Sequence, residues 1–133
     1  MNLKTVMGVA SAIGLALLGG WLWGASGKAA VTLERRAFAE RADLAEARAD
    51  LLDARLSLLG SNFGDAAKSL DRARRIVADV QVRLREAGQA ERAGRVEIVL
   101  SRVRDAERLA AALDRTAADA AAQALLALSA IQK

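Results

Sequence analysis

The chain has 133 residues, of which 32 are Ala and 20 are Leu, and it contains no Pro, a composition that predicts an all-α protein because Ala and Leu are strong helix formers. It also has no Cys and no His, which excludes disulfides, thiol or imidazole catalysis and the usual zinc ligands. The net charge is +4, but residues 31–133 interleave 18 basic with 16 acidic side chains, unlike the clustered basic face of nucleic-acid-binding proteins.

The first predicted element is a membrane span. No charged residue occurs between Thr5 and Gly24. As a helix, this stretch would be about 30 Å long, which matches the hydrocarbon core of a bilayer. Trp21 and Trp23 stand at its end, where indole rings prefer the headgroup layer. We therefore expect a single transmembrane helix at about 5–24, within an anchor and short linker that cover residues 1–27.

Two small residues near the end of this segment suggest a further role for it. Gly20 and Gly24 are four residues apart, and small residues at this spacing allow two helices to approach closely in lipid. We interpret the pair as a candidate helix–helix contact within the membrane.

Processing and orientation of this segment stay open. Ala25-Ser26-Gly27 resembles a signal-peptide cleavage site, and cleavage there would release a secreted helical binding protein. Lys4 before the segment favours an inside N-terminus, whereas the basic residues after it, including Lys28 and Arg35, favour the opposite orientation. We expect an uncleaved signal anchor in a bacterial-type inner membrane, with the helical domain on the periplasmic side.

Residues 28–133 form the second predicted domain, an antiparallel helical bundle or hairpin of about three helices with coiled-coil-like spacing. The first helix, at about 31–59, has apolar residues at three-four spacing on one face. These residues are Leu33, Ala37, Leu44, Ala47, Leu51, Ala54 and Leu58. The stretch from Gly60 to Gly64 then predicts a tight turn.

The remaining chain predicts two more helices, at about 65–87 and 95–131. Asp65 begins the first of them, and residues 88–94, with a Gly at each end, separate the two. The 95–131 pattern alternates three and four throughout, and no Gly or Pro interrupts it, so one long helix is expected. The alternative is a break near Asp114, because Thr116-Ala-Ala-Asp119 has the form of a capping box.

Residues 54–73, ARLSLLGSNFGDAAKSLDRA, resemble the hairpin of a tetratricopeptide repeat. In that family a small residue ends the first helix, an aromatic residue follows, and a small residue begins the second helix. The matching positions are Gly60 or Ser61, then Phe63, Ala66, Leu70 and Ala73. The resemblance covers about one repeat, and it implies that Phe63 fills the gap between two closely packed helices. The overall layout is similar in style to membrane-anchored helical proteins of the mitofilin type.

The expected function is a membrane-tethered helical scaffold or adaptor, without catalytic activity, cofactor, metal, small-molecule substrate or nucleic-acid partner. A protein partner is expected to dock on an Ala-rich seam of the third helix. This seam comprises Ala106, Ala110, Leu113, Ala117, Ala120, Ala124 and Leu128. The alternative is that the same seam is bundle core. A second functional alternative is a self-associating stalk or homo-oligomeric subunit of a membrane complex, similar to rotary-ATPase peripheral stalks.

Overall fold

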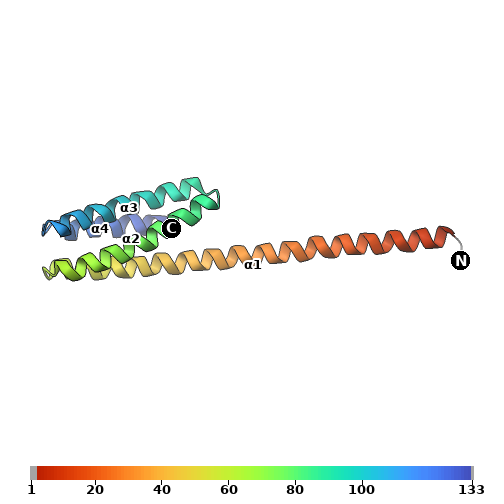
Figure 1. Cartoon of the computed structure of the whole chain (residues 1–133), viewed down its shortest axis with the longest axis horizontal. Helices are drawn as coiled ribbons and strands as arrows, with labels where there is room; N and C mark the ends of the chain where they lie inside the picture. The colour runs from red at the N-terminus through yellow and green to blue at the C-terminus, as the bar shows by residue number, and fades with distance from the viewer. Residues whose placement is uncertain (1–2, 133) are drawn as a thin grey trace. The chain divides into compact units, whose positions relative to one another are not determined.

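A computed structural model of the chain describes the backbone of residues 3–132 and the side chains of residues 31–132. Its regular structure within residues 3–132 is entirely helical, which confirms the predicted all-α class (Figure 1). The helices are α1 (Leu3–Leu59), α2 (Phe63–Glu86), α3 (Ala90–Ala111) and α4 (Ala117–Ile131). The chain divides into two compact units, Met1–Phe38 and Ala39–Lys133.

The predicted membrane span at 5–24, with Gly20, Trp21, Trp23 and Gly24, lies outside the residues whose side chains are described. Among the residues that are described, no helix is sufficiently long and apolar to cross a bilayer.

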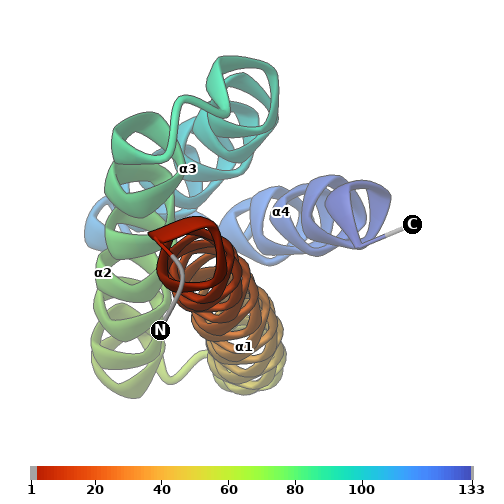
Figure 2. The same cartoon turned by 90° about the vertical axis from the view of Figure 1, so that its right-hand side faces the viewer.

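The second unit is a bundle in which the end of α1 and the three later helices alternate in direction (Figure 1). In Figure 2, viewed nearly along α1, the helices α2, α3 and α4 and the end of α1 surround a common centre. Its apolar interior draws on all four helices, with Leu51, Leu70, Leu100 and Leu128 among its largest fully buried side chains. Eleven of the 23 buried apolar residues among the described ones are Ala, which lets the helices approach closely.

The three turns of the bundle share one backbone geometry. After α1, the N–H of Asn62 donates to the carbonyl of Ser57 at 2.8 Å and that of Ser61 to Leu58 at 3.0 Å. This pair of bonds is the Schellman motif, which requires one residue in the left-handed conformation. The same pair recurs after α2 and after α3. The left-handed residues are Ser61 (φ 58°), Gly88 (φ 73°) and Leu113 (φ 55°).

The expectation of one continuous helix over 95–131 was wrong, because a turn at 112–116 separates α3 from α4. Leu113 adopts a left-handed conformation, and Asp114 Oδ1 accepts hydrogen bonds from the N–H (2.8 Å) and Oγ1 (2.7 Å) of Thr116. The break therefore falls near Asp114, as in the alternative prediction. It does not use a capping box, since the Thr116 side chain makes no cap hydrogen bond to α4.

The boundaries of the predicted helices also need correction. The structure has four helices where about three were expected, and α3 begins at Ala90 rather than at residue 95. Gly94, which was assigned to a loop, lies inside α3. The turn between α2 and α3 is correspondingly shorter than predicted, because the Schellman motif at Gly88 reverses the chain within residues 87–89.

Candidate interaction surface

The end of α1, residues 39–59, has two distinct apolar faces. Its inner face is buried in the bundle and comprises Leu44, Ala47, Leu51, Ala54 and Leu58. Its other face, called here the outer stripe, is exposed in the described structure and comprises Ala42, Ala45, Ala49, Leu52, Leu56 and Leu59. Leu56 is 72% exposed and Leu59 is 66% exposed. Large apolar side chains on one exposed helix face are typical of a protein contact surface.

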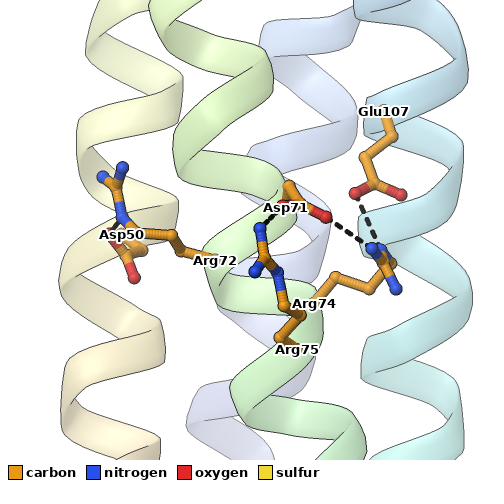
Figure 3. Close-up of polar contacts among 6 residues, drawn as sticks. All are labelled: Asp50, Asp71, Arg72, Arg74, Arg75 and Glu107. Atoms are coloured by element: carbon orange, nitrogen blue, oxygen red, sulfur yellow. Dashed lines mark hydrogen bonds and ion pairs between the residues drawn. The ribbon is translucent and has the colours of Figure 1, made fainter.

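Ion pairs on the inner side of α1 fix this helix against the bundle. Arg72 of α2 donates from Nε to Oδ1 of Asp50 at 2.8 Å, and its Nη2 donates to Ser69 at 3.0 Å. Figure 3 shows Arg72 and Asp50 meeting between α2 and α1. Two further pairs join the same region of α1 to the bundle. They are Asp43 with Arg83 and Glu40 with Arg92.

A second group of charges joins α2 to α3. Arg74 donates to Asp71 and, at 3.0 Å from Nε, to Oε1 of Glu107 on α3, while Arg75 also donates to Asp71 (Figure 3). The hydrogen bonds from Arg75 and Arg74 lower the pKa of Asp71 below its ordinary value. The Arg74–Glu107 pair joins α2 to α3, and the pairs of Asp71 with Arg74 and Arg75 lie within α2. All of these charges are paired, so we assign them a structural role.

The buried polar side chains are also satisfied. Gln81 is buried on α2, and its Nε2 donates to the carboxylate of Glu97 and to the carbonyl of Ala93, at 3.4 Å. The hydrogen bond from Gln81 is the main cause that lowers the pKa of Glu97. Among the described residues, no buried side-chain nitrogen or oxygen lacks a hydrogen-bond partner.

The hollows of the bundle are small or open. A cavity where all four helices meet, lined by Leu44, Leu84, Val96 and Ile131 among others, has a volume of about 20 Å³, sufficient for one water molecule. The depression between α1 and α2 that contains Asp43 and Arg83 is widely open to solvent. Within residues 31–132, no cluster of acidic side chains is arranged to hold a metal ion.

The four predicted hairpin residues all lie on α2, and they are buried in the core or packed against it. Ala66, Leu70 and Ala73 are fully buried along α2. Phe63 is the first residue of α2 and packs half-buried against the core. Asn62 precedes it and accepts a hydrogen bond from the N–H of Asp65 at 3.3 Å, which caps the helix.

The predicted partner seam lies largely inside the bundle. Ala106, Ala110, Ala117, Ala124 and Leu128 are buried and Ala120 is half-buried, because the turn at 112–116 folds α4 back onto α3. Leu113 alone of the seven is strongly exposed, at 66%. The seam is therefore part of the bundle core, as in the alternative interpretation. It offers no continuous surface to a partner.

Sequence reasoning identified only one of the two apolar faces of α1. The residues of the outer stripe also recur at alternating spacings of three and four, and this second pattern was the available signal. It is easy to miss because its first three members, Ala42, Ala45 and Ala49, are small and common throughout the chain.

Comparisons with known proteins give no relative of this chain: no protein-family model, no curated protein and no solved structure matches it. The resemblance of residues 54–73 to a tetratricopeptide-repeat hairpin therefore stays a prediction.

Proposed function

We propose that this protein is a membrane-tethered helical scaffold that presents the outer stripe of α1 to another protein chain. The observation that carries the proposal is the exposure of Leu52, Leu56 and Leu59 on one side of α1, while its opposite side holds the bundle. Apolar anchors at i, i+4 and i+7 are the pattern by which one helix packs against another. The small volume of the cavity where the helices meet, and the satisfied buried polar groups of the described residues, also favour a contact role over a role in binding small molecules.

The tether in this proposal is the uncharged segment from Thr5 to Gly24. Its length and its terminal tryptophans support a span. A bacterial-type inner membrane with the bundle on the periplasmic side remains our preferred arrangement.

Membrane flotation of the full chain tests the tether. The wild-type chain is expected to float with vesicles and to resist alkaline extraction. A Leu17→Lys/Leu18→Lys variant, which places two charges within the segment, is expected to lose this retention. Recovery of the uncleaved wild-type chain without detergent in the aqueous fraction would contradict the tether.

Thiol labelling in native membranes tests the contact surface. The chain has no Cys, so Leu56→Cys carries the single thiol. Its matched control is Leu126→Cys on α4, because Leu126 is also a strongly exposed Leu, at 64%, and lies outside the outer stripe. We expect a maleimide to label Leu56→Cys several-fold more slowly than Leu126→Cys in membranes, and equally fast after denaturation. Equal rates in intact membranes would overturn the proposed contact surface.

A further inference from the structure

The outer stripe has the spacing of a coiled-coil seam. Its members fall on the first and fourth positions, a and d, of three successive heptads. The a positions are Ala42, Ala49 and Leu56, and the d positions are Ala45, Leu52 and Leu59. All six are exposed in the described structure. Leu52 and Leu59 give the d positions the residue that parallel two-stranded coiled coils carry there, and the a positions hold Ala or Leu in place of the usual β-branched residue.

The bundle leaves this seam free. The buried residues of α1 that project into the bundle occupy the c and f positions of the same heptads, as Leu51 and Ala54 show. At about 100° per residue, the centres of the two faces are about 160° apart around the helix. A second helix can therefore lie along the outer stripe without contacting α2, α3 or α4 of the same chain.

The charged residues that flank the seam are basic on one side and acidic on the other. The g positions are Arg41, Arg48 and Arg55, and the e positions that follow the first two are Glu46 and Asp53. Within the described residues, none of these five side chains has an ion pair or a hydrogen bond. By contrast, the acids at the inner edges of α1 are each paired with an arginine of α2 or α3. Those acids are Glu40, Asp43 and Asp50.

We propose that the outer stripe binds the outer stripe of a second copy of this chain, as a parallel two-stranded coiled coil. In a parallel pair, each g side chain faces the e side chain of the next heptad on the partner helix. Arg41 would then meet Glu46, and Arg48 would meet Asp53, twice each by symmetry. In an antiparallel pair, g faces g and e faces e, so arginines would oppose arginines and acids would oppose acids.

The inference deepens the proposed function and rests on it for the orientation. Two copies held in one membrane by their N-terminal segments would bring their α1 helices together in the same direction. Such tethering raises the effective concentration of one stripe for the other, which compensates for a seam of only three heptads.

Disulfide formation between single-cysteine chains tests the pairing and its direction. Ala42→Cys and Leu59→Cys place one thiol at each end of the outer stripe. In a parallel dimer, each engineered cysteine lies beside the same cysteine of the second chain, within the Cα separation that a disulfide tolerates. In an antiparallel dimer the like thiols would be about 25 Å apart, since 17 residues of helix separate the positions. Both full-length variants, reconstituted in vesicles and mildly oxidised, are expected to form mostly disulfide-linked dimers.

Matched controls lie on other helices. Ala67→Cys on α2 is the control for Ala42→Cys, and Leu126→Cys on α4 is the control for Leu59→Cys, because each pair shares residue type and exposure. Both controls are expected to give at least fivefold less dimer. Failure of Ala42→Cys and Leu59→Cys to exceed their controls would overturn the dimer. Crosslinking only between Ala42→Cys and Leu59→Cys in a mixture of the two would overturn the parallel direction.

A charge exchange tests the flanking pairs independently. Arg48→Glu, in the Leu59→Cys background, is expected to lower the disulfide yield at least threefold, and Asp53→Arg is expected to do the same. The double variant Arg48→Glu/Asp53→Arg restores opposite charges across the interface and should recover the yield. Equal yields in all four proteins would overturn the assignment of these pairs.

The outcomes separate this inference from the proposed function. Slow labelling of Leu56→Cys in floating membranes, together with control-level disulfide yields, would reject the second copy and leave the contact surface in place. Fast labelling together with control-level yields would reject both.

Discussion

Asp50 of α1 and Arg72 of α2 form an ion pair at 2.8 Å, although 22 positions separate them in the sequence. The Asp50 side chain is 11% exposed, whereas that of Arg72 is 52% exposed. The carboxylate is thus mostly withdrawn from water and depends on Arg72 for compensation. Together with the pairs of Asp43 and Glu40, this contact holds the inner side of α1 on the bundle and leaves the outer stripe facing solvent.

Asp50→Asn should destabilise the bundle by about 1–2 kcal/mol, because it removes the charge from a mostly buried hydrogen bond. The loss of stability is limited because the Arg72 guanidinium is half-exposed, so that water can replace the carboxylate as its hydrogen-bond partner. Urea unfolding of the full chain in mild detergent, followed by helical circular dichroism, measures it. Asp79→Asn changes an exposed acid whose side chain makes no ion pair in the described structure, so it should cost less than about 0.5 kcal/mol. Equal losses in the two variants would contradict the role of Asp50.

Replacement of Gly by Ala should have opposite effects on the stability of the bundle at two positions, Gly94 and Gly88. Gly94 lies inside α3, and a Cβ there would meet no atom within 4 Å. Gly94→Ala should therefore stabilise the bundle by about 1 kcal/mol, the difference in helix propensity. Gly88 has a φ of 73°, where an L side chain is strained. Gly88→Ala should destabilise by about 1 kcal/mol. A shift of the same sign in both variants, measured by thermal unfolding, would contradict these backbone assignments.

The left-handed backbone of Leu113 is strained, so a substitution there should be able to stabilise the bundle. It is a branched residue at φ 55° in the turn between α3 and α4, and its side chain is exposed. Leu113→Gly should stabilise by roughly 0.5–1 kcal/mol, because relief of the left-handed strain exceeds the added entropy of the unfolded chain. Leu113→Val should destabilise, since β-branched residues tolerate positive φ least. Should Leu113→Gly unfold at lower urea than the wild type, the turn geometry would be wrong.

Acid should weaken the bundle through a defined set of carboxylates. The pKa values of Asp65, Asp71, Glu97 and Asp114 are lowered in the folded chain. Their contribution to stability is therefore present above the unfolded pKa, about 4, and is lost as pH falls below it. The urea midpoint should be nearly constant from pH 8 to about 5 and should fall below about pH 4.

Asp114→Asn isolates one of these contributions. The pKa of Asp114 is lowered mainly by the backbone N–H of Thr116, and then by the Thr116 hydroxyl. Asn keeps an acceptor oxygen for both donors but does not titrate. The variant should lose part of the acid sensitivity while retaining the turn. An unchanged pH profile would contradict the assigned shift.

Periodicity was sufficient to predict the inner face of α1 from Leu44 to Leu58, and composition predicted the helical class. The turn predicted at residues 60–64 is shorter than expected, because α2 already begins at Phe63 and the turn is confined to residues 60–62. Periodicity failed at residues 112–116 because the pattern of spacing three and four continues through the turn. Only the local hydrogen bonds of Asp114 and the backbone of Leu113 reveal the break. A Leu in a left-handed conformation leaves no compositional signal, whereas Gly88 marked the preceding turn.

The candidate surface was mislocated for a related reason. A strong apolar seam predicts burial but does not say whether the chain itself or a partner buries it. The seam from Ala106 to Leu128 is buried by its own chain. The weaker outer stripe of α1 stays exposed because the bundle already occupies the opposite side of that helix. Only the fold, which assigns one face of α1 to the interior, distinguishes the two.

The number of chains in a single membrane particle tests the account most directly. The native mass of the full-length protein in lipid nanodiscs should correspond to two copies. It should fall to one copy in Leu52→Glu/Leu56→Glu, with helical content unchanged because both side chains are exposed in the described structure. One copy in the wild type, or two copies in this variant, would contradict the pairing of two chains through the outer stripe.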